Sequence, residues 1–466
     1  MQKHVDSDFI LQHIPHVQIT YKPLQPNATF TIDSRMVQPG DIFVAITGNK
    51  SDGHDFIEQA LQRQASGLMI NHTHEKKVIS QHGSILNTIS LIVVADTTQA
   101  LIDLAKAWRQ QFQYPIVGIT GTVGKTTTKE MVRNILKVAH KPAVVSFGNQ
   151  NTLLGISMNI LKMRHEHTAA VFEMGISQQG DMEKLVDLVQ PTLSVITHVG
   201  HGHTQGLGSV QNVAHEKRMI FSKLSEKNIG IINGDIAELA NISYTHPVIR
   251  FGKKTNNQIQ ARKINISENS MSFIAKIYNK KYSVILPTCN QARIMNALAA
   301  IAVGYVLEIP DEHLIQGVQQ PIITKSRFQI IELPSGSTII DDAYNANPES
   351  MKAALTAFNS YQTNKNKIVV LGDMLSLGHD SAFWHRQIGR FLQKIHNLHQ
   401  IVLIGSEVQQ MKKVIPFKAN CFFFDSIESA QEHVKNIVLQ PQNVILFKAS
   451  HSMRFEQLLE IVQNKK

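Results

Sequence analysis

Residues Gly118–Met131 read GITGTVGKTTTKEM and follow the apolar run YPIV. A strand that runs into a glycine-containing turn and then into a helix places backbone N–H groups around an anion. In such a loop Lys125 reaches the β- and γ-phosphates of a nucleotide, and the Thr126 hydroxyl ligates Mg²⁺. The sequence therefore predicts a nucleotide site built from the loop residues Gly121, Thr122, Val123, Gly124, Lys125, Thr126 and Thr127.

The loop departs from the common spacing GxxxxGK[ST], because Ile119 occupies the place of the first glycine. The next apolar strand, AAVFEMG, ends in Glu173, where motor ATPases and GTPases carry an aspartate. A carboxylate at the carboxyl end of a strand beside the loop is expected to ligate magnesium directly. The alternative is that Glu173 caps a helix or forms a salt bridge.

Strands and helices alternate on both sides of the loop. We expect strands at 115–120, 143–147, 169–175 and 193–197, with helices between them, which predicts right-handed βαβ units and a parallel sheet. Residues 264–286 instead alternate polar and apolar residues, with turns at SENS and YNKK, which predicts antiparallel strands. The helical stretch RIMNALAAIAVGYVL follows them.

The flanking segments predict two further domains. Before residue 110 the chain holds short β-type runs and one helical stretch, FIEQALQRQ, as in a small α/β domain. After residue 320 the alternation resumes, with strands expected in STIIDDAY, KIVVLGD, QIVLIG, CFFFD and VILFKA. A chain of 466 residues is long enough for about three domains, so we place boundaries near residues 110 and 320.

The amino-acid composition indicates which kinds of ligand the protein is suited to bind. The 46 Lys+Arg residues outnumber the 36 Asp+Glu residues, which suits a phosphate or carboxylate ligand. Nucleic acid is disfavoured, because the positive residues are spread out and no aromatic-interleaved basic stripe occurs. Cys289 and Cys421 lie far apart without a CxxC companion, so neither a zinc site nor a disulfide is indicated. With no signal peptide and no membrane span of about 18 apolar residues, we expect a soluble, cytoplasmic protein.

A histidine-rich segment, HVGHGHTQGLGS, follows the strand at 193–197 and contains His198, His201 and His203. A zinc site is disfavoured, because no cysteine accompanies these histidines and glycine-rich spacing orients ligands poorly. A single histidine that assists a mainly oxygen-bound Mg²⁺ fits better. Lys217 lies on the next helix and is either a surface lysine or, once carbamylated by CO₂, an anionic magnesium ligand.

Together these residues resemble the Mur ligases, ATP-dependent amide-forming enzymes of peptidoglycan synthesis. The shared features are the GTxGKT loop, the strand-final Glu173, the segment from His203 to GxGS, and Lys217 in AHEK ahead of an aromatic residue. Four longer strings extend the resemblance over the whole chain: IDSRMVQPGDIFVAITGNKSDGHDFI, GNQNTLLGIS, DDAYNANPESM and VVLGDMLSLGHDSAFWHRQIG. They are most similar to the family member that adds D-alanyl-D-alanine to UDP-N-acetylmuramoyl-tripeptide.

The resemblance implies an α/β protein of three domains. These are a small N-terminal α/β domain for the UDP-sugar peptide (1–110), a central P-loop, parallel-sheet ATPase domain (111–320) and a C-terminal Rossmann-like ligase domain (321–466). It implies contacts to the uridine nucleotide from Ser34 and Arg35, to ATP from Asn296, Arg327 and Asp342, and to substrate from Asn149, Asn151, Tyr344 and Asn345. The implied catalytic residues are Lys125, Glu173, His203 and Lys217, and a monomer is expected.

The implied reaction has two stages. The terminal carboxylate of UDP-MurNAc-tripeptide attacks the γ-phosphate of ATP, and the amine of D-Ala-D-Ala then displaces phosphate from the acyl-phosphate to give the pentapeptide. Two Mg²⁺ ions are expected, one held by Thr126 and Glu173 and the other by His203 and carbamylated Lys217.

Several positions depart from the family pattern. Ala292 and Arg293 stand where His-Asn is usual, His198 replaces an asparagine, and KASH, with His451, replaces KGSR. The usual P-x-G-R is ITKSR around Arg327. Because Lys125, Thr126, Glu173, His203 and Lys217 are spared, we expect activity to survive.

Other functions stay open. A sister ligase that adds the third peptide residue would show a DNPR-like string, and none occurs here. The chain could also be a folylpolyglutamate synthase, a non-catalytic descendant that binds the UDP precursor, or a P-loop ATPase acting on nucleic acid.

Overall fold

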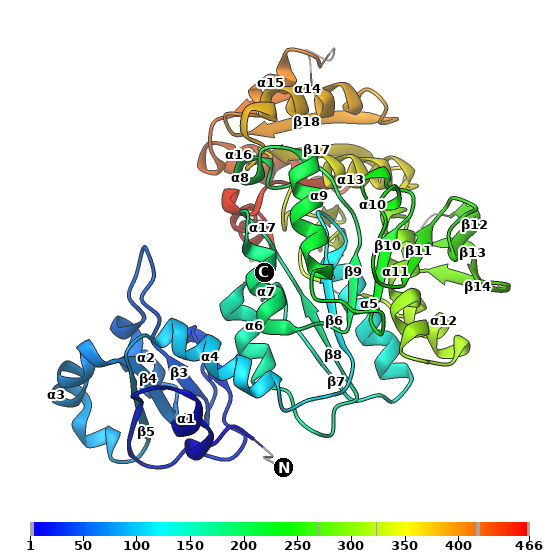
Figure 1. The fold of residues 1–466 in the computed structure, drawn as a ribbon. Coiled ribbons are helices and arrows are strands. Elements are labelled where there is room, and N and C mark those ends of the chain that lie inside the picture. The colour runs from blue at the N-terminus through cyan, green and yellow to red at the C-terminus, as the bar shows by residue number, and fades with distance from the viewer. Residues whose placement is uncertain (1–3, 268–269, 323, 416–419, 464–466) are drawn as a thin grey trace.

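The computed structural model describes residues 4–267, 270–322, 324–415 and 420–463, and the turn predicted at SENS lies partly outside them. Three sheets with their helices follow one another along the chain (Figure 1), which confirms the predicted α/β architecture. The N-terminal domain, blue in Figure 1, lies beside the middle domain, and the C-terminal domain, yellow to red, lies against another side of it. Among the described residues, no helix has the length and apolarity needed to cross a bilayer.

The N-terminal domain has a five-stranded sheet in the order β1-β5-β4-β3-β2, in which β1 is antiparallel to β5 and the other pairs are parallel. Its strands are β1 (Gln18–Tyr21), β2 (Phe30–Thr31), β3 (Ile42–Val44), β4 (Gly67–Asn71) and β5 (Ser90–Val94). Its helices are α1 (Ser7–His13), α2 (Ile57–Gln62), α3 (Glu75–Leu86) and α4 (Thr97–Arg109). The prediction of one helix, at α2, was therefore incomplete.

Helix α4 joins the N-terminal domain to the middle domain. Trp108 is completely buried, and its Nε1 donates to the Met163 carbonyl at 3.2 Å. The Arg109 guanidinium donates to the carbonyls of Val189 and Gln190 at 2.7 and 2.9 Å. Apolar side chains of both domains form one continuous core around this helix, so α4 fixes the two domains to each other.

The middle domain has a nine-stranded sheet in the order β14-β13-β12-β11-β10-β9-β6-β8-β7. Its strands are β6 (Ile116–Thr120), β7 (Ala143–Val145), β8 (Ala169–Glu173), β9 (Leu193–Ile196), β10 (Ile229–Asn233), β11 (Val248–Gly252), β12 (Ile259–Ile266), β13 (Met271–Ile277) and β14 (Lys280–Leu286). Pairs from β7 to β12 are parallel, and β12–β14 form the predicted antiparallel extension. Strands β10 and β11 were not predicted.

The helices of the middle domain cover both faces of this sheet. They are α5 (Lys125–Val138), α6 (Leu153–Ile160), α7 (Asp181–Val189), α8 (Thr204–Leu207), α9 (Val210–Arg218), α10 (Ala237–Ala240), α11 (Ala292–Val306) and α12 (Asp311–Gln319). Val117 and Ile119 of β6 pack with residues of α5, α11 and α12, whereas Ile116 packs with residues of α6, α7 and α9. Strand β6 is thus buried on both faces, as expected for a central parallel strand.

The C-terminal domain has a six-stranded sheet in the order β15-β16-β20-β17-β18-β19. Its strands are β15 (Gln329–Glu332), β16 (Thr338–Asp341), β17 (Asn366–Gly372), β18 (Leu398–Ile404), β19 (Cys421–Phe424) and β20 (Asn443–Lys448). Its helices are α13 (Pro348–Ser360), α14 (Ser381–Leu392), α15 (Gln409–Lys412), α16 (Ile427–Val438) and α17 (Glu456–Gln463). The five predicted strands are present and parallel, and β15 adds an antiparallel edge.

Candidate active site

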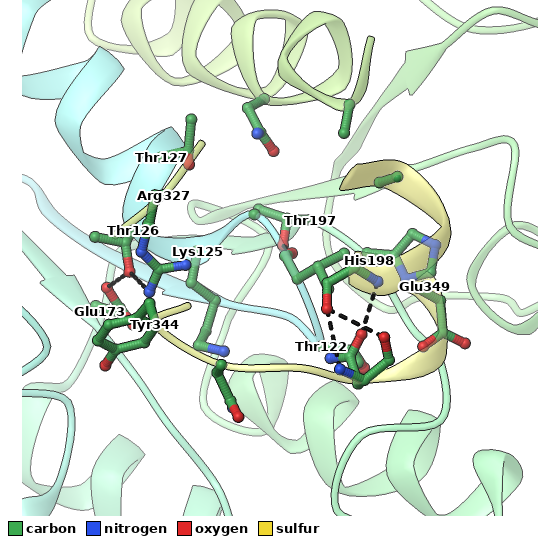
Figure 2. Close-up of a pocket in the computed structure, with 18 of the residues that line it drawn as sticks. Thr122, Lys125, Thr126, Thr127, Glu173, Thr197, His198, Arg327, Tyr344 and Glu349 are labelled. Carbon is green, nitrogen blue, oxygen red and sulfur yellow. Dashed lines mark hydrogen bonds between the residues drawn. The ribbon is translucent and has the colours of Figure 1, made fainter. Parts of the chain in front are cut away.

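A cavity of about 340 Å³ lies between the middle and C-terminal domains, at the carboxyl ends of β6, β8 and β9 (Figure 2). Ligands bind at this edge of open parallel sheets because helix N-termini and strand-end loops meet there. The lining includes fourteen of the residues predicted for the site: Thr122, Val123, Gly124, Lys125, Thr126, Thr127, Asn151, Glu173, His203, Asn296, Arg327, Asp342, Tyr344 and Asn345.

Two glycines of the phosphate loop let side chains of other elements approach the loop backbone closely. Gly124, the N-cap of α5, has a φ of +87°, and a Cβ there would collide with the Asn296 amide oxygen. A Cβ on Gly121 would collide with the Thr197 hydroxyl, which donates to the Val123 carbonyl at 2.6 Å. Gly121 and Gly124 therefore stand where Thr197, just after β9, and Asn296 of α11 approach the loop backbone.

The Thr126 hydroxyl and the Glu173 carboxylate lie next to each other and are joined by a hydrogen bond in Figure 2. Thr126 Oγ1 donates to Glu173 Oε2 at 2.7 Å, and Asn151 Nδ2 donates to Oε1 at 2.9 Å. Lys129 Nζ is 4.0 Å from Oε2 and donates instead to the Gly148 carbonyl at 2.6 Å. Thr126 and Glu173 thus bring together two hard oxygen atoms of the kind that Mg²⁺ prefers, and the alternative salt bridge of Glu173, to Lys129, is also present.

Arg327 reaches from the C-terminal domain into the middle domain. Its Nη2 donates to Thr126 Oγ1 at 3.0 Å, and its guanidinium lies 4.0 Å from the centre of the Tyr344 ring. Arg293, on α11, donates from Nη2 to the Arg327 carbonyl at 3.1 Å. The two domains are therefore closed on each other at the phosphate loop, and one of the departures from the family pattern, Arg293, takes part in that contact.

Burial and neighbouring basic side chains lower the pKa values of Lys125, His203 and Lys217 in and beside the site. Burial lowers the pKa of Lys125, which donates to the Gly121 carbonyl at 2.8 Å. Burial, helped by the nearby charge of Lys125, holds the pKa of Lys217 well below its ordinary value. Burial and the charges of Lys125 and Lys217 lower the pKa of His203 to about 4. His203 is thus neutral at pH 7 and can act as a metal ligand, and a neutral Lys217 amine is the form that reacts with CO₂.

The three histidines of the glycine-rich segment do not converge on one point. His201 bonds Glu349, while His198 and His203 line the cavity separately. Among the described residues, the His, Cys, Asp and Glu side chains close enough to share a metal are Asp52, His54 and His74 in the N-terminal domain. There the ring centroids of His54 and His74 are 3.8 Å apart and the rings are stacked. Their nitrogen lone pairs therefore lie in nearly parallel planes and do not point toward one ion.

Five predicted site residues lie outside the cavity lining. The Gly121 carbonyl accepts from Lys125, and Lys217 is buried in α9. Asn149 is near enough to Tyr344 to lower the pKa of its hydroxyl, which burial raises. In the N-terminal domain the Ser34 hydroxyl donates to Gln59 Oε1 at 2.6 Å, and Arg35 is exposed and paired with Asp33. Their predicted role toward a uridine nucleotide stays a prediction.

The cavity also contains residues that were not assigned a role from sequence. Lys448, 2% exposed at the end of β20, donates to Asp342 Oδ2 at 2.6 Å and to the Asn345 carbonyl at 3.0 Å. Glu349 accepts from the N–H and Nδ1 of His201 at 3.0 and 2.7 Å. Glu349 lies in DDAYNANPESM, which was quoted for the family resemblance, and Lys448 lies in KASH, which was noted as a departure from the family pattern. Neither string indicated the partners of these residues.

Family models match most of the chain. The Mur ligase family catalytic domain matches residues 29–109, the Mur ligase middle domain matches 119–304, and the Mur ligase glutamate ligase domain matches 326–451. Curated relatives named UDP-N-acetylmuramoyl-tripeptide–D-alanyl-D-alanine ligase include those of Bacillus subtilis, 31% identical over 92% of this chain and 91% of the relative, and Escherichia coli, 28% identical over 93% of each.

Solved structures agree with the sequence relatives. MurF from Acinetobacter baumannii is 28% identical over the full length of both chains, with a TM-score of 0.81. MurF from Thermotoga maritima in complex with ADP is 26% identical over 94% of this chain and 97% of that one, with a TM-score of 0.75. The chain therefore belongs to the Mur ligase family of ATP-dependent ligases.

Proposed function

We propose that this protein joins D-alanyl-D-alanine to the terminal carboxylate of UDP-N-acetylmuramoyl-tripeptide, with ATP converted to ADP and phosphate. The observation that carries the proposal is the closed cavity in which the phosphate loop, Glu173 and the segment Asp342–Glu349 of the C-terminal domain face one another. The names of the relatives supply the substrates. The proposed domain roles are those expected from sequence, with the UDP-sugar peptide on the N-terminal domain near Ser34 and Arg35.

Thr126, Glu173 and His203 in the cavity lining, together with the buried Lys217 outside it, are the proposed ligands of two Mg²⁺ ions. Thr126 and Glu173 would hold one ion, and neutral His203 with carbamylated Lys217 would hold the other. A carbamate would convert a buried lysine, which repels a metal, into an oxygen anion that binds it. Bound magnesium neutralises phosphate oxygens and so lowers the barrier to phosphoryl transfer.

The protein's own groups then act by position and charge. The loop amides and Lys125 are placed to stabilise negative charge on the phosphoryl group as it moves to the substrate carboxylate. Arg327 reaches the same region from the other domain, so domain closure brings in a cation and excludes water together. Exclusion of water protects the acyl-phosphate until the amine attacks it.

We further propose that a monomer acts in the cytoplasm. One chain supplies every group named above, so no second copy is required. Cys289 and Cys421 are free thiols, which suits a reducing compartment.

Phosphate release tests the proposed function. With ATP, Mg²⁺, UDP-MurNAc-tripeptide and D-Ala-D-Ala, we expect release that falls to background when either acceptor is omitted or when Lys125 is replaced by alanine. Nucleotide binding without turnover would instead support a non-catalytic descendant. Stimulation by DNA or RNA with a steep salt dependence would support the nucleic-acid ATPase.

A further inference from the structure

Glu349 differs from the other carboxylates that line the cavity. Glu173 accepts from Thr126 and Asn151, and Asp342 accepts from Lys448. Glu349 has neither a lysine nor an arginine within ion-pair distance among the described residues, and its Oε2 is buried without a hydrogen-bond partner. A buried carboxylate oxygen that no protein group satisfies is costly, which points to a ligand donor missing from its surroundings.

The other carboxylate oxygen of Glu349 is held in place. Oε1 accepts both the N–H and the Nδ1 proton of His201, whose ring packs against Trp384 at 4.2 Å. A Cβ on Gly200 would lie 2.6 Å from Oε1, so the loop approaches the carboxylate this closely only because residue 200 is glycine. These contacts orient Oε1 toward the loop and leave Oε2 without a protein partner at the cavity wall.

The same contacts place Glu349 beside the phosphate loop. The N–H of Gly200 donates to Thr122 Oγ1 at 3.0 Å, so one loop touches both the phosphate loop and Glu349. Figure 2 shows Glu349 and His198 on the Thr122 side of the cavity, apart from the group of Thr126, Glu173 and Arg327. Glu349 lies in the first turn of α13, where the helix dipole favours a negative charge.

The proposed reaction needs such a group. D-Ala-D-Ala brings an α-ammonium, which is the main form at pH 7, into a cavity lined by Lys125, Arg293, Arg327 and Lys448. These cations suit ATP and the acyl-phosphate but repel an ammonium, and only a neutral amine can attack a carbonyl carbon.

We propose that Glu349 is a further catalytic residue, which binds the ammonium of the incoming D-Ala-D-Ala through Oε2 and accepts its proton; this rests on the proposed function. One proton of the ammonium first passes to Glu349 and then to solvent, and the lone pair of the resulting neutral amine forms the C–N bond at the acyl carbon. The tetrahedral intermediate collapses as the C–O bond to phosphate breaks, and phosphate leaves with the electron pair and takes the second proton. His201 is a positioning residue that holds Oε1.

Glu349→Gln separates this role from a structural one. Glutamine keeps an oxygen for His201 but can neither neutralise an ammonium nor accept its proton. With the complete reaction mixture, we expect pentapeptide formation to fall about 100-fold or more, the usual range for loss of a general base. With hydroxylamine, which is uncharged at neutral pH, in place of D-Ala-D-Ala, we expect hydroxamate formation within twofold of the wild-type rate, because the acyl-phosphate still forms.

The pH dependence provides a second measurement. The deficit of Glu349→Gln should narrow as pH rises through about 8, where the dipeptide amine loses its proton unaided. Glu428→Gln, an exposed residue in the first turn of α16, is the charge-matched control and should behave as wild type.

Three results would separate failure of the proposed role of Glu349 from failure of the proposed function. Equal loss of pentapeptide and hydroxamate in Glu349→Gln would show a structural role, and unchanged pentapeptide formation would show no role at all; either overturns the inference alone. If the wild-type protein forms neither product, the proposed function itself fails.

Discussion

At the scale of single residues, the site gathers basic side chains around the phosphate loop, among them Lys125, Arg293, Arg327 and Lys448. Lys217 is buried and Lys125 is partly buried. Burial is the largest cause of the lowered pKa of His203, and the charges of Lys125 and Lys217 lower it further. Among the carboxylates, Glu173 is the one that raises the pKa of Lys125 against this effect. Such a charge distribution suits anionic ligands such as the phosphate groups of a nucleotide.

Lys217→Ala tests the carbamate. We expect a loss of activity of at least about 100-fold, because an anionic metal ligand disappears, and partial recovery when a short carboxylic acid is added to replace it. Intact-protein or peptide mass spectrometry of wild type under gentle conditions should show one added CO₂ on Lys217.

Lys125→Ala is the matched control, because its lost charge cannot be replaced by a carboxylic acid and its activity should not recover. The carbamate on Lys217 would be contradicted if a carboxylic acid does not restore the activity of Lys217→Ala and if the wild-type protein carries no added CO₂.

At the scale of elements, the parts that could be predicted were those with a local signal. The phosphate loop, the strand-final Glu173 and the alternation around them follow from residues adjacent in sequence. Helix α3 was missed because only Val78 and Leu86 of its twelve residues are buried, so its apolar periodicity is faint. Helix α4 had a signal that went unused, namely Asp96, whose side chain caps Thr98 and Gln99.

The tertiary contacts of the site could not be read from the sequence. His201 and Glu349 are 148 positions apart, and Arg327 and Thr126 are 201 apart, so no local pattern links them. The resemblance to Mur ligases named Arg327 and Asp342 but not Glu349, whose significance comes from its unpaired oxygen.

Helix α14 contains a buried imidazole that makes stability pH-dependent. His385 is completely buried, accepts from the Met374 N–H at 3.0 Å and donates to the Ser381 carbonyl at 2.8 Å. Burial lowers its pKa below 6.5. Below pH about 6.5 the unfolded chain binds a proton that the folded protein does not, so the free energy of unfolding falls on acidification.

We therefore expect the free energy of unfolding to fall less steeply between pH 7.5 and 5.5 in His385→Gln than in wild type, by up to about 1.4 kcal/mol per pH unit. Denaturant titrations at several pH values measure the slope. His379→Gln, in the exposed turn before α14, is the matched control. If that variant changes the slope as much as His385→Gln does, the buried imidazole is not the source.

At the scale of the whole molecule, the three domains meet through a few defined contacts. Helix α4 fixes the N-terminal domain to the middle domain, and Arg327, Glu349 and the contact from Gln205 N–H to the Ser376 carbonyl at 3.1 Å close the C-terminal domain on the site. Closure assembles the cavity from two domains, so the chemistry depends on their arrangement as much as on any single residue.

In the proposed reaction, the γ-phosphate of ATP is transferred to a substrate carboxylate before the amide bond forms. The most direct test uses UDP-MurNAc-tripeptide whose terminal carboxylate oxygens are labelled with ¹⁸O, together with ATP, Mg²⁺ and D-Ala-D-Ala. We expect one ¹⁸O atom in each released phosphate, because the bridging carboxylate oxygen leaves with the phosphoryl group. Unlabelled phosphate released alongside new pentapeptide would contradict it.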